Sequence, residues 1–159
     1  MIIKAALPAD TSQIILVAEK TGVFSREELG VLQELLEVYL HPGPNDAYEF
    51  VVYRDGTPDS VVGFGCYGPI PMADRIWDMY WLGVDPAQQG KGIGNMIMKT
   101  VEEDLARRGA RAIYLETSDS DHYQTARNLY KRRAYERMAH FPDYYKVGEG
   151  KVIFRKILN

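Results

Sequence analysis

The chain has 159 residues, of which 46% are hydrophobic and 26% charged, and a formal net charge of −3. This size and composition predict one domain over residues 1–159 with a buried core. The small negative charge argues against nucleic-acid binding, which needs a basic excess. No apolar run approaches the roughly 18 residues that a membrane span requires, and the N-terminal segment is too short for a secretory signal. We therefore expect a cytoplasmic protein.

Cysteine and histidine do not suggest a metal site. Cys66 is the only cysteine, so neither an internal disulfide nor a thiolate metal site can form. We expect it to fill space on a buried strand. His41, His122 and His140 are scattered along the chain without ligand spacing, and we interpret them as surface or turn residues. No metal is expected.

The N-terminal part of the chain predicts a strand followed by two helices. Residues 1–6 predict the strand, and residues 10–12 can cap a helix that ends at Gly22. The second helix has a clear start, because Ser25 and Glu28 have the spacing of a capping box. Leucines recur at helical spacing after this box until a Pro-Gly-Pro sequence ends the helix.

The rest of the chain alternates between strands and helices. Helices are predicted from a glycine-rich turn to about Arg108 and from about Tyr123 to Arg133. The last two strands are predicted to be joined by a loop over residues 142–150. Apolar, β-branched and aromatic residues predict strands at 48–53, 61–67, 76–84, 112–115, 135–141 and 152–158.

The glycine-rich turn indicates a phosphate site. Gly90, Gly92 and Gly94 occupy alternate positions just before a helix, where main-chain amides lack partners and the helix dipole favours negative charge. A dinucleotide fingerprint would need its third glycine at Asn95. A Walker loop would need a glycine five residues before Gly90, which is absent. Both nucleotide motifs are therefore excluded.

What remains is Gln89-x-x-Gly92-x-Gly94 after a strand that ends at Val84. This resembles the acyl-CoA pyrophosphate loop of the GNAT superfamily of N-acetyltransferases. Residues 126–135 resemble a second motif of that family, Ala-x-x-hydrophobic-Tyr-x-x-x-Gly-Phe, and the order of elements matches over nearly the whole chain. The resemblance implies an α/β fold (α+β in some schemes): a mixed sheet of about seven strands, splayed between the fourth and fifth, with about four helices.

By the same resemblance, acetyl-CoA is the cosubstrate. The main-chain amides of Leu82 and Val84 would hold the pantetheine arm, and Gly83 would ease a bulge in the fourth strand. A main-chain donor there could also stabilise the oxyanion. The pyrophosphate would be held by the turn residues Gln89, Gly90, Lys91, Gly92, Gly94 and Asn95.

Tyr130 matches the tyrosine that, in the family, protonates the departing thiolate of CoA. The alternative is that Tyr130 only packs, since it shares a helical face with Ala126 and Leu129. Two positions depart from the family pattern. Ala134 replaces the usual glycine, so the following turn is expected to differ, and Tyr123 replaces a frequent asparagine that contacts CoA.

Two carboxylates are candidates for the general base. Glu116 resembles the glutamate base of ribosomal-protein alanine acetyltransferases, and we place it slightly ahead of Asp78. Asp78 stands within an apolar strand, where a carboxylate needs an explanation. The alternative for either is a solvated charge or a structural hydrogen-bond acceptor.

The acceptor is less well defined. Tyr144 and Tyr145 lie in a segment that resembles one beside the acceptor in peptide-acetylating members, although it could equally be a packed lid. Phe24 and Tyr80 are further candidates for substrate contacts. The function expected is acetyl transfer from acetyl-CoA to a primary amine of a small molecule or peptide, by direct attack in a ternary complex. The alternative is a catalytically silent acyl-CoA sensor. A homodimer is left open.

Overall fold

The computed structural model describes residues 2–57 and 60–158. Met1 of the first predicted strand and Pro58 of the predicted hairpin turn lie outside these residues. The helices are α1 Thr11–Thr21, α2 Arg26–Leu40, α3 Ile93–Arg107 and α4 Gln124–Arg132, with short 3₁₀ turns at Pro8–Asp10, Pro86–Gln88 and Asp121–Tyr123. The strands are β1 Ile2–Ala5, β2 Glu49–Arg54, β3 Val61–Pro69, β4 Ile76–Val84, β5 Ala112–Ser118, β6 Glu136–Lys146 and β7 Glu149–Ile157.

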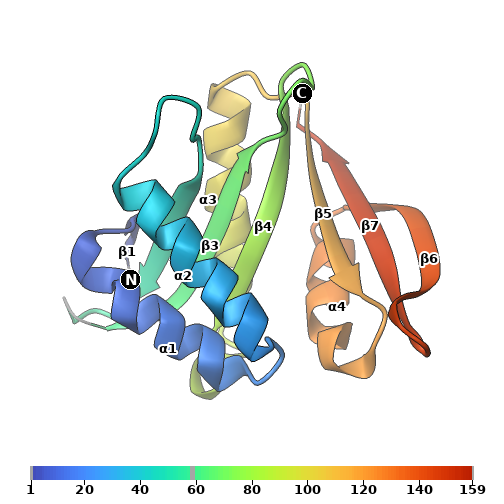
Figure 1. The fold of residues 1–159 in the computed structure, drawn as a ribbon, viewed down its shortest axis with the longest axis horizontal. Helices are drawn as coiled ribbons and strands as arrows, with labels where there is room; N and C mark the ends of the chain where they lie inside the picture. Colours follow the sequence, from blue (N-terminus) through green and yellow to red (C-terminus); the bar gives the residue numbers. More distant parts are fainter. Residues whose placement is uncertain (1, 58–59, 159) are drawn as a thin grey trace.

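All seven strands form one mixed sheet in the order β1-β2-β3-β4-β5-β7-β6. Every neighbouring pair is antiparallel except β4 and β5, which run parallel. Only the first part of β4 pairs with β5, from Ile76–Ala112 to Met79–Leu115. Beyond these pairs the strands diverge toward their carboxyl ends, as Figure 1 shows. The predicted fold, including the splay between the fourth and fifth strands, is confirmed.

The helices cover the two faces of the sheet unequally. One core joins α1 and α2 to β2 and β3, with Ile14, Leu32 and Phe64 fully buried. The other core joins α3 and α4 to residues from both halves of the sheet, including Met79, Leu115 and Phe154. In Figure 1, α1 and α2 cross only the β2–β4 part of the sheet. The opposite face of the β5–β7–β6 part packs against α4.

The start of α2 and the end of α1 follow the predicted signals, but the predicted cap of α1 does not form, because the Asp10 carboxylate accepts from the amide of Leu7 and from Arg54 instead. Ser25 accepts a hydrogen bond from the amide of Glu28, whose side chain accepts from the amide of Ser25, so the capping box is confirmed. Gly22 ends α1 in the left-handed conformation. Cys66 is fully buried on β3, as expected. Within the described ranges, no helix is both long enough and apolar enough to cross a bilayer.

Two predictions about strands were wrong. The segment 142–150 is not a loop, because β6 continues to Lys146 and β7 begins at Glu149. An irregularity lets this happen: Phe141 pairs with Lys151 and Lys146 with Glu149, so extra residues bulge out of β6 between them. The fifth strand is also longer than predicted and runs to Ser118.

The bulge in β4 was correctly expected, but it was placed at the wrong residue. Cys66 pairs with Trp81 and Tyr67 with Met79, so Tyr80 is the additional residue. Gly83 has a different role. A Cβ atom there would lie 2.5 Å from the ring of Phe64, which makes glycine necessary for close packing against β3.

Candidate active site

The turn between β4 and α3 presents main-chain amides to solvent. Gly90 and Gly92 have φ angles of 78° and 77°, a left-handed conformation that side chains disfavour. The first hydrogen bond of α3 runs from the amide of Met96 to the carbonyl of Gly92, at 3.0 Å. The amides of residues 93–95 thus precede the helical bonding pattern at the positive end of the helix dipole. This arrangement suits an anionic phosphate group.

The other predicted residues of the turn have structural contacts as well. Gly94 lets α3 approach α4, because a Cβ atom there would lie 3.2 Å from a methyl group of Leu129. The side chain of Asn95 accepts a 2.7 Å hydrogen bond from Arg133. Gln89 and Lys91 are exposed. Gln89 donates to the carbonyl of Val84 at 3.4 Å, and Lys91 to the side chain of Gln88 at 2.7 Å.

The hydrogen-bond direction along β4 leaves two amides available beside the splay. The amide of Asp85 donates to the carbonyl of Val62 on β3, at 2.9 Å. Because successive residues of a strand alternate in direction, the amides of Trp81 and Gly83 also point toward β3. Those of Leu82 and Val84 then point the opposite way, where β5 has already diverged. These are the two amides that the sequence predicted for a thioester-bearing ligand.

Tyr130 lies on α4 and is buried in the core that α4 shares with α3. Its ring centroid lies 6.0 Å from that of Tyr135 and 5.7 Å from that of Phe154, so the packing expected as the alternative is present. Burial raises the pKa of the Tyr130 phenol well above its usual value. The group therefore stays protonated at neutral pH, which a general acid must be.

Tyr123 connects the two halves of the molecule across the splay. Its hydroxyl donates a 3.2 Å hydrogen bond to the carbonyl of Val23 in the connection between α1 and α2. Burial, with the nearby charges of Glu28 and Glu149, raises the pKa of this phenol to about 12. The sequence had left the position unassigned. Its departure from the family pattern was the one signal that it has a different role here.

Asp78 and Glu116 project from the same face of the sheet. Their neighbours Met79 and Leu115 belong to the core under α3 and α4, so the alternating side chains of Asp78 and Glu116 point to the other face. Burial and, to a smaller extent, the negative charge of Glu116 raise the pKa of Asp78, and the positive charge of Lys151 lowers it; together they bring it to about 6. A carboxylate with such a pKa can take up a proton near neutral pH.

Glu116 has a different environment. It lies in the middle of β5, not at its end, and is exposed. It forms an ion pair with Lys151 of β7, which is only 15% exposed in its side chain and lies 4.5 Å from the ring centroid of Tyr144. This ion pair occupies the Glu116 carboxylate, whereas Asp78 keeps its carboxylate for other contacts of the site. Sequence reasoning missed Lys151, because nothing local to the last strand indicates its partner on another strand.

The aromatic candidates lie on both sides of these carboxylates. Tyr80 is 40% exposed and its ring meets that of Tyr48 edge-on. Phe24 packs against Trp81, with ring centroids 4.9 Å apart. Tyr144 and Tyr145 remain exposed, but they project from the bulged part of β6, not from a loop.

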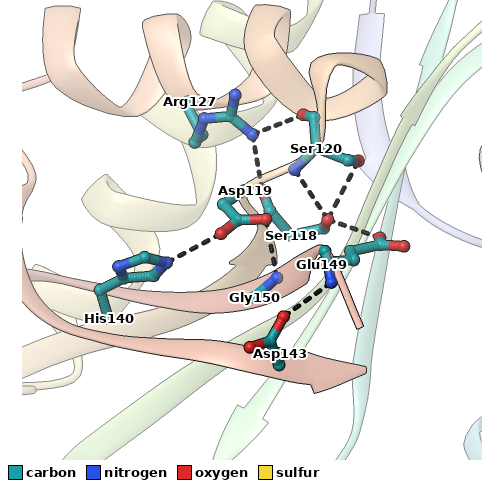
Figure 2. A network of polar contacts seen from close by, with 9 residues as sticks. Ser118, Asp119, Ser120, Arg127, His140, Asp143, Glu149 and Gly150 are labelled. Atoms are coloured by element: carbon teal, nitrogen blue, oxygen red, sulfur yellow. Dashed lines mark hydrogen bonds and ion pairs between the residues drawn. The ribbon is translucent and has the colours of Figure 1, made fainter. Parts of the chain in front are cut away.

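A polar network fixes the β6–β7 hairpin beside the end of β5 (Figure 2). Asp119 accepts a 2.7 Å hydrogen bond from the amide of Gly150 and lies 2.8 Å from the imidazole of His140. A Cβ atom at Gly150 would lie 2.5 Å from the Asp119 carboxylate, so only glycine permits this contact. Arg127 of α4 donates to the carbonyls that flank Asp119. The network therefore holds the residue next to Gly150, Lys151, in place.

The predicted site residues thus form two groups on opposite faces of the sheet. Asp78, Glu116 and Tyr80 share one face, and Tyr130 lies on the other. Between the carboxyl ends of β4 and β5 no strand pairing separates the two faces, and the exposed turn before α3 follows directly from β4. The sheet is splayed, amides are available at the splay, and a turn suited to phosphate lies beside it. These features together are those of an acyl-CoA-dependent transferase.

Comparison with known proteins gives the family. The model of the acetyltransferase (GNAT) family matches residues 15–135, so this chain belongs to the GNAT family of acetyltransferases. A solved structure of a GNAT-family acetyltransferase from Desulfovibrio desulfuricans is 32% identical, with a TM-score of 0.92 over 99% of each chain.

Two further relatives are less similar to this chain. An aminoglycoside 6'-N-acetyltransferase solved with coenzyme A is 18% identical, with a TM-score of 0.76 over 100% of this chain and 98% of the other. The mycothiol acetyltransferase of Rhodococcus erythropolis is 26% identical over 134 residues, which are 82% of this chain but 44% of that protein. The chain thus spans less than half the length of this curated relative.

Proposed function

We propose that this protein is an N-acetyltransferase that moves the acetyl group of acetyl-CoA to a primary amine of a small molecule or peptide. The observation that carries the proposal is the parting of β4 from β5 between Asp78 on one face and Tyr130 on the other. A donor and an acceptor could approach this point from opposite faces and meet. The proposal treats the whole chain as one acyl-CoA N-acyltransferase domain that acts in the cytoplasm.

The free amides are proposed to bind the acetyl donor. The amides at the start of α3 would bind the pyrophosphate, because they combine unsatisfied donors with the positive end of the helix dipole. The amides of Leu82 and Val84 would bind the pantetheine arm and the thioester oxygen. That an aminoglycoside 6'-N-acetyltransferase with this fold was solved with coenzyme A supports CoA as the ligand.

Asp78 is proposed as the general base, acting directly or through one water molecule. With a pKa of about 6 it is ionised at neutral pH and can accept a proton from the ammonium form of the acceptor. The free amine then attacks the thioester carbonyl carbon, and the carbon–sulfur bond breaks. The thiolate takes a proton from the buried hydroxyl of Tyr130, and the second proton that the nitrogen loses as it becomes the amide returns the phenol to its protonated form. Glu116 and its partner Lys151 would tune the pKa of Asp78 in opposite directions.

Two measurements test this function. Calorimetry with coenzyme A and acetyl-CoA should detect binding of both, and a thiol-release assay with a panel of amines and peptides should detect acetyl-dependent turnover. Binding of CoA without turnover on any acceptor would favour the sensor function. Absence of CoA binding would contradict both. Sedimentation of the same sample would decide whether the protein is a homodimer.

A further inference from the structure

A cavity of about 300 Å³ opens on the same sheet face as Asp78 and Glu116. Tyr114 forms part of its wall, and Tyr114 is the direct β5 partner of Asp78. The cavity is lined by Ile76, Arg111, Ala112, Tyr114, Arg155 and Ile157. Two residues along a strand span about 7 Å, so the cavity begins roughly that far from the candidate base. In Figure 1, α1 and α2 leave this part of the sheet uncovered.

The cavity has an apolar floor and two guanidinium groups. Arg155 lies opposite Tyr114 across β5 and β7. Its Nη2 atom donates a 2.8 Å hydrogen bond to Glu136, and its side chain also interacts with Tyr114 of the cavity wall. Arg111 contacts the carbonyl and carboxylate of Asp74, at 3.2 and 3.3 Å.

The ion pairs of these two arginines do not close the cavity to an anion. The side chain of Glu136 is 65% exposed and that of Asp74 is 70% exposed, so both pairs are weakened by water and can exchange. A guanidinium group offers five donors, and a carboxylate or phosphate can accept two of them at once. The side chain of Arg155 is 28% exposed, so part of it is accessible to such a ligand.

The sign of the charge changes along this face of the sheet from the splay to the cavity. Asp78 lies at the splay beside the ion pair of Glu116 with Lys151, which leaves a net negative charge there, and the guanidinium groups of Arg111 and Arg155 lie at the cavity. This arrangement is complementary to a molecule with an ammonium group at one end and an anion at the other. We propose that the cavity binds the anionic group of the acceptor, and that the preferred acceptor is an amine with a carboxylate or phosphate about 7–10 Å away. This inference rests on the proposed function.

The first test does not depend on acetyl transfer. The Nε–H signal of Arg155 in ¹⁵N-resolved NMR, identified by its loss in Arg155→Lys, is followed during titration with 6-aminohexanoate and with hexylamine. We expect a saturable shift with 6-aminohexanoate and none with hexylamine. Inorganic phosphate as a separate titrant shows whether the site prefers phosphate to carboxylate. If neither anion shifts the signal at tens of millimolar, the proposed site is wrong.

The second test measures turnover. The kcat/KM for 6-aminohexanoate should exceed that for hexylamine at least tenfold, and Arg155→Gln and Arg111→Gln should each reduce the ratio severalfold. Arg107→Gln, an exposed change at the end of α3, is the matched control and should leave it unchanged. Arg111 is exposed, so its variant tests the site even if Arg155→Gln does not fold. Equal kcat/KM for both amines would overturn the acceptor preference. An NMR shift without any acetylation would contradict the proposed function alone.

Discussion

The turn before α3 and the polar patch of Asp78, Glu116 and Lys151 lie at the same splay but are built differently. The turn depends on main-chain amides, and its shape follows from two left-handed glycines and a helix start within a few residues. The patch depends on side chains from β4, β5 and β7, which only the register of the sheet brings together. The comparison teaches that binding and chemistry should respond to different substitutions.

Removal of the Tyr130 hydroxyl should separate CoA binding from catalysis most clearly. Tyr130→Phe should lower kcat roughly a hundredfold or more, because the thiolate loses its proton donor, and should leave CoA affinity unchanged. Steady-state kinetics and calorimetry measure the two effects. Tyr135→Phe is the matched control, since it removes a neighbouring buried hydroxyl that has no hydrogen-bond partner among the described residues. Unchanged kcat in Tyr130→Phe would remove this residue from the mechanism.

The turn can be altered without touching a side chain of the patch. Gly92→Ala should weaken CoA binding about tenfold, because the new Cβ atom points into the space proposed for the pyrophosphate and the left-handed backbone is strained by roughly 1–2 kcal/mol. Calorimetry gives the affinity and urea unfolding gives the strain.

Gly109→Ala supplies the control for that substitution. Gly109 follows the other end of α3, has a φ of 72°, and also has open space around its Cβ position. It should lose similar stability and keep its CoA affinity. Equal affinity losses in both variants would mean that strain, and not a phosphate contact, explains the result.

Substitutions in the polar patch should change the pH profile of kcat/KM, an effect smaller than those of the substitutions above. If Asp78 must be ionised, kcat/KM should rise as the pH increases through about 6. Glu116→Gln removes a like charge, so it should lower the inflection, and Lys151→Gln removes an opposite charge, so it should raise it, each by about one pH unit or less. Shifts of both variants in the same direction would exclude this electrostatic coupling.

The smallest effect concerns the connection that leads from α4 into β6. Ala134 adopts a φ of 62°, so the left-handed turn that a glycine would form is retained, and the expectation of a different turn was wrong. Ala134→Gly should relieve this strain and stabilise the fold by about 0.5–1 kcal/mol after the entropy cost of glycine. Urea unfolding measures the change.

The control for Ala134→Gly is a second alanine-to-glycine substitution that should change the free energy of unfolding in the opposite direction. Ala106 is exposed within α3, and Ala106→Gly should destabilise by about 1 kcal/mol because glycine is a poor helix former. Destabilisation by both substitutions would show that the Ala134 backbone is not strained.

Much of the fold could be predicted because its signals are local. The capping box at Ser25, the left-handed end of α1 at Gly22 and the extent of β4 each depend on residues within one element. The predictions failed where the structure depends on pairing between strands that are far apart in the sequence. The bulge at Tyr80 and the continuation of β6 through residues 142–146 depend on which strand lies alongside, and no short pattern encodes that.

For the candidate site, residue type and spacing in the sequence pointed to the glycine turn before α3 and to Asp78 within an apolar strand, and the family resemblance pointed to Glu116 and Tyr130. The tertiary structure decided what surrounds them: Lys151 against Glu116, Tyr123 against Val23, and the burial that raises the pKa of Asp78. The physical reason is that backbone conformation is set by near neighbours in the chain. Electrostatic environment is set by groups that only the folded sheet brings within a few ångströms.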